Sequence, residues 1–322
     1  MNLGKHTLTG GLNLTTDSFS ENPVYSGMDR KFGQWTAGLF GQNDWQIALP
    51  FTLQTGLRVD WDNHYGFQIV PRVAGIYRLS DEVGLRASAG LGYKVPTIFS
   101  DQSDPDVIYK LNPVGCNVTV EKSMGGEFDF TYRAVAFGKI SLILNQAFFY
   151  TRVNSPILLT AEATPASLSL ANANGHLFSR GAETDIKVAY GDLDAFIGYT
   201  FTDAQKRFSE SHGELFLTPP HKFVMDVLVD VEGFGEGGIE LRYTGRQLIH
   251  DGTKSPDFLV LDFLFQKKFS HFTFFVAVEN LLNFKEANYT PVVTGGSVNP
   301  QFNDVWAPLE GRVVNVGLKF QM

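Results

Sequence analysis

Apolar and polar side chains alternate along most of this chain, and the clearest example is its last segment. From residue 313 to 322 one side of the alternation is wholly apolar: Val314, Val316, Leu318, Phe320 and Met322. The residues between them are polar or small, apart from Val313. A period of two is that of a β-strand, and about ten residues suit a tilted strand that crosses a bilayer. The pattern therefore predicts a strand with one face toward lipid.

The same alternation predicts an all-β protein, an antiparallel transmembrane β-barrel with about 14 visible strands. The expected strands are 5–17, 33–42, 46–62, 67–80, 82–95, 118–132, 135–152, 170–190, 193–204, 221–232, 237–248, 257–268, 270–282 and 311–321. A soluble β-sandwich also alternates, but its strands are usually nearer six residues long.

The connections between these strands are expected to alternate in length. Short turns are predicted at 42–44, 79–82, 133–138, 191–192, 232–238 and 268–271. Long loops are predicted at 18–32, 96–117, 153–169, 205–220, 249–256 and 283–310, with a tighter connection at 63–66. In transmembrane barrels the short turns are periplasmic and the long loops extracellular. The last strand then leaves the C-terminus in the periplasm.

Composition supports this architecture and excludes several classes of function. Aromatic residues make up 13% of the chain and glycine contributes 32 residues, which suits a barrel with an apolar outside and a polar inside. No run approaches 18 apolar residues, so no transmembrane helix is predicted. The net charge of −8 argues against a nucleic-acid partner. The single cysteine, Cys116, excludes an internal disulfide and a cysteine-based zinc site.

Several segments resemble the TonB-dependent outer-membrane receptors, in the order in which that family carries them. They are TGLRVDWDNHYG (55–66), PRVAGIYRLSDEVGLRASAGLGYKVPTIFS (71–100), SRGAETDIKVAYG (179–191), VENLLNFKEANY (278–289) and WAPLEGRVVNVGLKF (306–320). The resemblance implies the outer membrane of a Gram-negative bacterium, contact with its lipid, and a 22-strand barrel of which residues 1–322 form the C-terminal portion as a single domain. We recognise neither the family's plug domain nor a signal peptide. The family commonly ends on an aromatic residue, whereas here Gln321 and Met322 follow Phe320.

The resemblance also implies a function. Ligand would bind to extracellular loops and the plug, and a TonB-type energy-transducing protein would pull on the plug from the periplasm. The expected cargo is a ferric siderophore or a similar large, scarce nutrient, with cobalamin as the next candidate. A passive 14-strand channel for polar or hydrophobic solutes is the alternative. A plug encoded upstream would favour the receptor, and a signal peptide joined to residue 1 would favour the channel.

Two sets of residues are candidates for the functional site. The lumen- or plug-facing set consists of Arg58, Asp60, Arg86, Glu127, Asp129, Glu183 and Asp185. These residues form either a ligand path and plug-docking surface or mutual ion pairs in a wet lumen. The loop set, where binding residues concentrate, consists of Tyr109, Lys110, His250, Tyr289, Asn303 and Trp306.

Other chemistry is weakly indicated. Asp101, Asp104 and Asp106 offer oxygen ligands for calcium but lack the spacing and glycine of a calcium loop. The chain has no His-Glu-x-x-His motif and no Gly-x-Ser-x-Gly motif, so we expect neither an enzyme nor a resident metal or cofactor.

Overall fold

Long antiparallel strands make up most of the protein. The structure, a computed structural model, describes residues 1–22, 30–99, 110–161, 167–209 and 211–320. The long strands are β2 (His6–Ser20), β3 (Lys31–Ala48), β4 (Phe51–Asp62), β5 (Gly66–Arg78), β6 (Val83–Lys94), β7 (Glu121–Ala136), β8 (Ile140–Asn154), β11 (Gly175–Tyr190), β12 (Leu193–Phe208), β14 (His221–Val231), β15 (Gly235–Thr244), β16 (Phe258–Lys268), β17 (Phe272–Glu279) and β20 (Val313–Phe320). The shorter elements are β1 (Asn2–Leu3), β9 (Ile157–Ala161), β10 (Leu168–Asn172), β13 (His212–Glu214), β18 (Val293–Gly296), β19 (Asn299–Phe302) and the 3-10 turn η1 (Glu286–Asn288).

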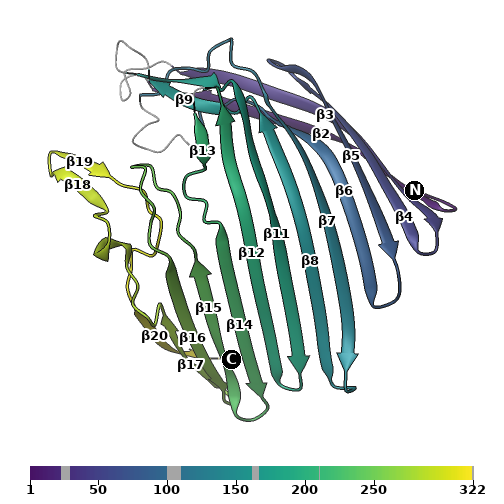
Figure 1. Cartoon of the computed structure of the whole chain (residues 1–322), viewed down its shortest axis with the longest axis vertical. Helices are drawn as coiled ribbons and strands as arrows, with labels where there is room; N and C mark the ends of the chain where they lie inside the picture. The colour runs from purple at the N-terminus through teal and green to yellow at the C-terminus, as the bar shows by residue number, and fades with distance from the viewer. Residues whose placement is uncertain (23–29, 100–109, 162–166, 210, 321–322) are drawn as a thin grey trace.

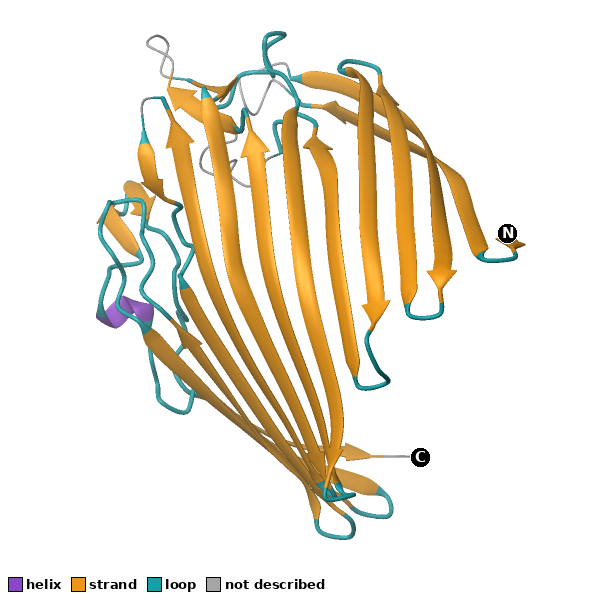
Figure 2. Cartoon of the chain, turned by 45° about the vertical axis from the view of Figure 1, so that its right-hand side comes forward, coloured by secondary structure: helices purple, strands orange, loops and turns teal. Residues whose placement is uncertain are grey.

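The long strands form one curved sheet in which each strand pairs with its neighbour in the sequence (Figure 1). Within the described residues, β1 and β20 are the two edges of this sheet, so the first and last strands do not pair with each other (Figure 2). Consecutive strands are antiparallel, so connections alternate between the two ends of the sheet. We call the end reached by the connections after β2, β6, β8, β12, β15 and β17 the loop end, and the opposite one the turn end. The predicted fold, an antiparallel barrel wall of about 14 strands, is confirmed.

One predicted turn is wrong. Residues 42–44, where a short turn is predicted and where Asn43 and Asp44 favour turns, lie within β3. There each of them is paired on both sides, as Asn43 is with Leu8 of β2 and Thr55 of β4. The reversal lies instead at Leu49 and Pro50. Pairing with two neighbouring strands therefore outweighs the local preference for a turn.

The predicted loops contain structure that alternation did not reveal. After β8 the chain forms a small hairpin of β9 and β10, and after η1 another of β18 and β19. The hairpin after β8 packs on the loop that follows β6, where Leu111, Val118 and Leu170 form a small buried core with Ile98. The loop end is therefore partly folded by its own apolar contacts.

The register of the sheet defines two faces. Phe128, Phe148, Ala182 and Phe201 are direct neighbours across β7, β8, β11 and β12, and the three phenylalanines are exposed. We call this side the outer face, because exposed phenylalanine in such numbers suits lipid rather than water. Residues one position away in each strand lie on the opposite, lumen face.

Aromatic side chains mark both borders of the outer face. At the loop end Trp61 contacts Phe67, with ring centroids 4.5 Å apart, and Tyr150 is exposed. At the turn end Trp45 and Tyr190 are exposed. Ten residues separate Tyr150 from Ile140 on β8, which at about 3.3 Å per residue and a 40° tilt spans about 25 Å. This is the height expected of a barrel's apolar band. No helix in the described ranges is long and apolar enough to cross a membrane.

Candidate functional site

All seven residues of the predicted lumen-facing set lie on the lumen face by register. Arg86 on β6 is opposite Asp129 on β7, and Ala147 on β8 separates Asp129 from Glu183 on β11. One Asp129 carboxylate oxygen is buried and has no hydrogen-bond partner among the described residues. No group of three or more His, Cys, Asp or Glu side chains in the described ranges is arranged to hold a metal ion.

Arg58 and Asp60 form the best-ordered part of the lumen face. Arg58 Nε is 2.8 Å from Asp60 Oδ2, and the Tyr93 hydroxyl donates to the same oxygen at 2.7 Å. Asp60 is only 1% exposed, so these bonds compensate for taking its charge out of water. The next lumen-facing residue, Asp62, accepts hydrogen bonds from Gln34 and Thr36, both at 2.8 Å.

Tyr93 is a residue that alternation misplaced. Its position in the 83–93 pattern puts it with the lipid-facing residues, yet its hydroxyl reaches the lumen carboxylate of Asp60. The ladder between β5 and β6 ends at Arg72 and Gly90. Beyond Gly90 the strand has lost one neighbour, so the period-two rule no longer fixes the direction of its side chains. Asp62, by contrast, could have been found by extending the series Arg58, Asp60 by two residues.

Two adjoining cavities lie at the loop end, beside this polar group. The first, of about 480 Å³, is lined by residues that include Arg30, Tyr65 and Cys116. The second, of about 530 Å³, is lined by residues that include Arg58 and Tyr93. Phe32, Gln34 and Thr97 line both. Cavities of this size and mixed lining are typical of small-molecule sites.

Aromatic rings form one wall of these cavities. Phe19 lies edge-on to Phe99 at 5.1 Å between centroids, and 5.7 Å from Phe32. Burial, together with the nearby Asp62 charge, raises the pKa of the Tyr65 phenol, so its hydroxyl stays protonated at neutral pH and can donate a hydrogen bond. Buried Arg30, just before β3, pairs with Glu21. It also donates a hydrogen bond to the Leu111 carbonyl oxygen at 3.1 Å, which connects the start of β3 to the loop after β6. Sequence reasoning missed this group because its members come from three separate segments.

The predicted loop residues lie in different surroundings. His250 is exposed; its Nδ1 is 2.7 Å from Asp304 and its ring is 4.3 Å from that of Phe216, so three loops meet there. Asn303 donates to the Pro291 carbonyl at 2.6 Å. Lys110 lies beside the small core, next to Leu111, and its carbonyl oxygen accepts from the Leu168 amide at 2.9 Å. Tyr109, Asp101, Asp104 and Asp106 lie outside the described residues.

Trp306 is buried rather than presented to solvent. It is 6% exposed and packs among Phe258, Phe284 and Tyr289, with centroids 6.0 to 6.3 Å away. Its backbone N–H donates to the fully buried carboxylate of Glu286 at 2.7 Å. These contacts favour a structural role for Trp306, whereas Tyr289 is exposed at the edge of the same cluster.

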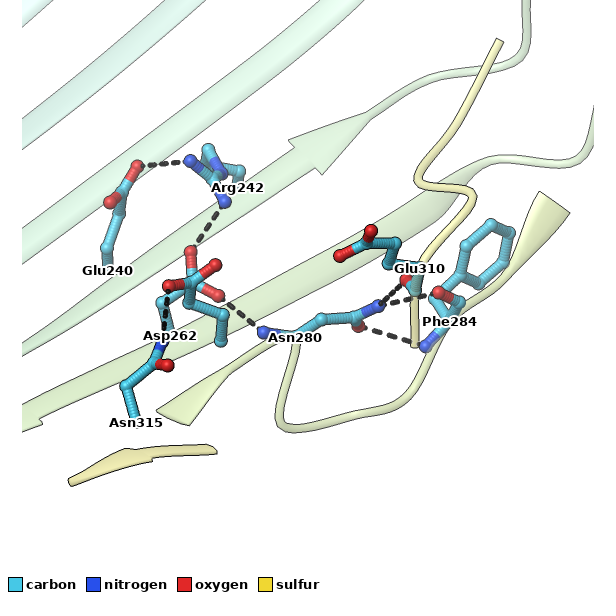
Figure 3. Close-up of polar contacts among 8 residues, drawn as sticks. Glu240, Arg242, Asp262, Asn280, Phe284, Glu310 and Asn315 are labelled. Carbon is cyan, nitrogen blue, oxygen red and sulfur yellow. Dashed lines mark hydrogen bonds and ion pairs between the residues drawn. The ribbon is translucent and has the colours of Figure 1, made fainter. Parts of the chain in front are cut away.

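A series of hydrogen bonds and ion pairs connects the loop after β17 to the lumen face (Figure 3). Arg242 on β15 bridges Glu240 and Asp262, and Asp262 accepts from the Asn280 backbone N–H at 2.6 Å. The Asn280 side chain then bonds Phe284 and the Glu310 carbonyl. Asn280 has φ +50°, a conformation that Asn tolerates better than most residues.

Comparison with known proteins agrees with this architecture. A family model described as TonB dependent receptor-like, beta-barrel matches residues 2–281. The iron-regulated outer membrane virulence protein of Vibrio cholerae serotype O1 is 22% identical over 278 residues, which are 79% of this chain and 41% of that protein. A mutant of the ferric enterobactin receptor PfeA from Pseudomonas aeruginosa, in complex with enterobactin, aligns with a TM-score of 0.78 at 15% identity, over 99% of this chain and 52% of that one. The copper transporter OprC aligns with a TM-score of 0.70 at 16% identity, over 100% and 54%.

The chain thus spans about half the length, or less, of the relatives it matches. The family model covers most of its residues and confirms the resemblance found in the sequence. The matched family consists of transporters, not enzymes. The loop end is therefore extracellular and the turn end periplasmic, and the chain belongs to the TonB-dependent receptor β-barrel family, located in the outer membrane of a Gram-negative bacterium.

Proposed function

We propose that residues 1–322 form one barrel domain of an outer-membrane receptor that takes up a ferric siderophore or a similar large, scarce nutrient. The observation that carries this proposal is the pair of adjoining cavities at the extracellular end of the lumen face. Together they offer about 1,000 Å³, at the upper end of the range of small-molecule sites.

The lining suits a bulky chelate with planar and hydrogen-bonding parts. Phe19, Phe32 and Phe99 present ring faces and edges against which flat groups of a ligand can stack. Gln34 and the protonated Tyr65, which line the first cavity with Phe32, supply hydrogen-bond donors. A chelate held there would lie at the mouth of the lumen, above the charged rows of Asp60 and Asp129.

Energy for uptake would come from a TonB-type partner acting through a plug domain. The lumen-facing set would then be the surface against which that plug rests. Removal of the partner should abolish uptake by the receptor, whereas a passive channel would continue to conduct its solute. This comparison separates the proposed receptor from the passive 14-strand channel.

Uptake of radioactive iron by a strain that lacks the gene tests the proposal. The strain would be complemented with the full-length gene, with a Phe32→Ala and Tyr65→Phe double variant, or with Phe67→Ala as a control on the outer face. We expect the cavity variant to lower uptake of ferric chelates at least tenfold, and the control to stay within twofold. Normal uptake by the cavity variant would exclude this cavity as the binding site, and normal uptake of every iron chelate by the deletion strain would leave cobalamin as the cargo to test.

A further inference from the structure

The two adjoining cavities at the loop end carry an excess of negative charge. Among the described residues, some charged side chains line a cavity and others bond to a side chain that does. The cations are Arg30, Lys31 and Arg58, and the carboxylates are Asp17, Glu21, Asp60 and Asp62. With His64 counted as neutral, this group has one more negative charge than positive charges.

Two of these carboxylates are built into the wall behind the cavities. Asp60 and Asp62 are 1% and 0% exposed. Gly38, opposite Asp60 on β3, leaves the space that the carboxylate occupies, because a Cβ at residue 38 would collide with Asp60 Oδ1. Besides its two side-chain donors, Asp62 accepts from the backbone N–H groups of His64 and Tyr65 at 2.9 and 3.0 Å. Hydrogen bonds of this number favour the ionised form, so the negative charge is a fixed part of the wall.

The buried carboxylates also decide what the lining residues can offer to a ligand. Thr36 donates its hydroxyl hydrogen to Asp62, and Tyr93 donates its own to Asp60. Each hydroxyl has one hydrogen, so both oxygens can act toward a ligand only as acceptors. Gln34 commits one amide hydrogen to Asp62 and keeps its carbonyl oxygen. These positions therefore present acceptors to the N–H groups of a ligand.

Both guanidinium groups at the cavities are balanced by a carboxylate in direct contact. Arg58 Nε donates to both carboxylate oxygens of Asp60, at 2.8 and 2.9 Å. The Arg30 side chain is 4% accessible and is held by Glu21 and by the Leu111 carbonyl oxygen. A multiply charged anion in either cavity would therefore meet a carboxylate directly behind each guanidinium, in surroundings where like charges repel more strongly than in water.

The aromatic wall favours the same kind of ligand. Phe19, Phe32 and Phe99 line the second cavity together with Asp17, and their ring centroids lie 5.1 to 6.2 Å apart. The face of a phenylalanine ring is the negative end of its quadrupole, so it attracts an ammonium group and repels an anion. Three rings beside a carboxylate therefore suit a cationic or uncharged group.

We propose that these cavities select an uncharged or cationic ferric chelate of the tris-hydroxamate type over an anionic chelate of the tris-catecholate type. Three hydroxamates neutralise ferric iron, and an amino group on the chelate adds a positive charge, whereas three catecholates leave a trianion. An ammonium group would lie between the three phenylalanines and Asp17, and N–H groups would donate to Thr36 and Tyr93. This inference rests on the proposed function and narrows its cargo.

Equilibrium dialysis of radioactive ferric chelates against the purified full-length receptor tests this proposal. Two probes are linear ferric tris-hydroxamates that differ by one charge, the first with a free terminal amine and the second with that amine acetylated. The third probe is a ferric tris-catecholate. Asp17→Asn and Asp17→Lys change the charge of an exposed lining residue. The matched control is Asp81→Asn, an exposed carboxylate in the periplasmic turn after β5.

We expect the acetylated tris-hydroxamate to bind at least about tenfold more tightly than the tris-catecholate, and the free amine to bind about threefold more tightly than its acetylated form. Asp17→Asn should remove most of the preference for the free amine, whereas Asp81→Asn should retain it. Asp17→Lys should strengthen binding of the tris-catecholate by about threefold or more.

The outcomes separate this inference from the proposed function. Equal or tighter binding of the tris-catecholate by the unaltered receptor would overturn the inference and leave the proposed function intact. An amine preference that Asp17→Asn leaves unchanged would also overturn it, and so would a catecholate affinity that Asp17→Lys leaves unchanged, because shape rather than charge would then decide. Failure of all three chelates to bind would contradict the inference and the proposed function together.

Discussion

Strands β7, β8, β11 and β12 carry a cluster of acidic residues on one face and a cluster of arginines on the other. The lumen face holds Glu127, Asp129, Glu183 and Asp185, while the extracellular end of the outer face holds Arg152, Arg180 and Arg207. The two sets are separated by one position along each strand, so nothing in local secondary structure distinguishes them. The difference lies in what each face meets. Water inside the barrel solvates carboxylates, whereas a charge on the outer face can be accommodated only beyond the apolar band, where it meets headgroups and water.

Adjacent residues at the centre of β8 give the largest expected contrast. Leu144 is on the outer face, about 15 Å from Tyr150 toward the bilayer centre, and Asn145 is on the lumen face opposite Asp185. We expect Leu144→Lys to lower the free energy of unfolding by about 2–4 kcal/mol, as charged residues do on the lipid face near the midplane. Asn145→Lys should change it by less than about 1 kcal/mol, because a lumen lysine stays hydrated and faces a carboxylate. Urea unfolding from lipid vesicles measures both.

Which of the two lysine substitutions costs more unfolding free energy shows which face of β8 meets lipid. A larger loss for Asn145→Lys than for Leu144→Lys would reverse the assignment of lumen and lipid on this strand. Leu144→Ala serves as a control for the lost side-chain volume, and we expect it to cost less than the lysine substitution because no charge enters the lipid.

Alternation was enough to predict the sheet because the bilayer imposes a simple rule on every strand. Phe128, Phe130 and Tyr132, or Val314, Val316 and Leu318, need no knowledge of distant partners to be assigned to one face. The rule fails where a strand loses a neighbour, as at Tyr93, and where local turn preference competes with pairing on both sides, as at Asn43. Both failures come from tertiary pairing, which a single strand does not encode.

The candidate site was less predictable for a related reason. Arg58 and Asp60 could be assigned to the lumen, but their partner Tyr93 lies on another strand, and the cavities combine residues from 13–36, 58–65 and 93–118. The outer-face cluster of Arg152, Arg180 and Arg207 was also missed, because these residues are far apart in the sequence and become neighbours only through the register of three strands. Trp306 was selected for its chemistry alone, and its burial could not be seen without its neighbours Phe258 and Phe284.

Replacing an arginine on the lumen face should lower the free energy of unfolding more than replacing one on the outer face. Arg58→Met leaves the buried Asp60 carboxylate with Tyr93 but without its cation, and we expect a loss of about 1–3 kcal/mol in unfolding free energy. Arg152→Met removes a side chain whose partner, Asn154, is neutral, and we expect less than about 0.5 kcal/mol. The lumen charge would then contribute to stability, and the outer charge would contribute little.

Unfolding of the Arg58→Met, Asp60→Asn double variant provides the control for the lumen pair. A neutral amide at position 60 no longer requires a cation, so the double variant should recover part of the loss. Equal destabilisation by Arg58→Met and Arg152→Met in lipid-free detergent would mean that both arginines are structural, and would remove this distinction between the faces.

A smaller loss than those of Leu144→Lys and Arg58→Met is expected at a polar pair inside the apolar band of the outer face. Gln146 and Thr184 are direct neighbours on β8 and β11, and the Thr184 hydroxyl donates to Gln146 Oε1 at 2.6 Å. Gln146 Nε2 also donates to the Glu183 carbonyl at 2.9 Å. If lipid tolerates polar groups only when they satisfy one another, Gln146→Leu should cost about 1 kcal/mol because it leaves the Thr184 hydroxyl without this acceptor. The Gln146→Leu, Thr184→Val double variant should then be at least as stable as the unaltered protein, since neither polar group is left. A double-mutant cycle in lipid vesicles measures the coupling energy between the two side chains. Additive losses from the two substitutions would show that each side chain finds another partner. The outer face would then be less strictly apolar at mid-depth than its phenylalanine rows indicate.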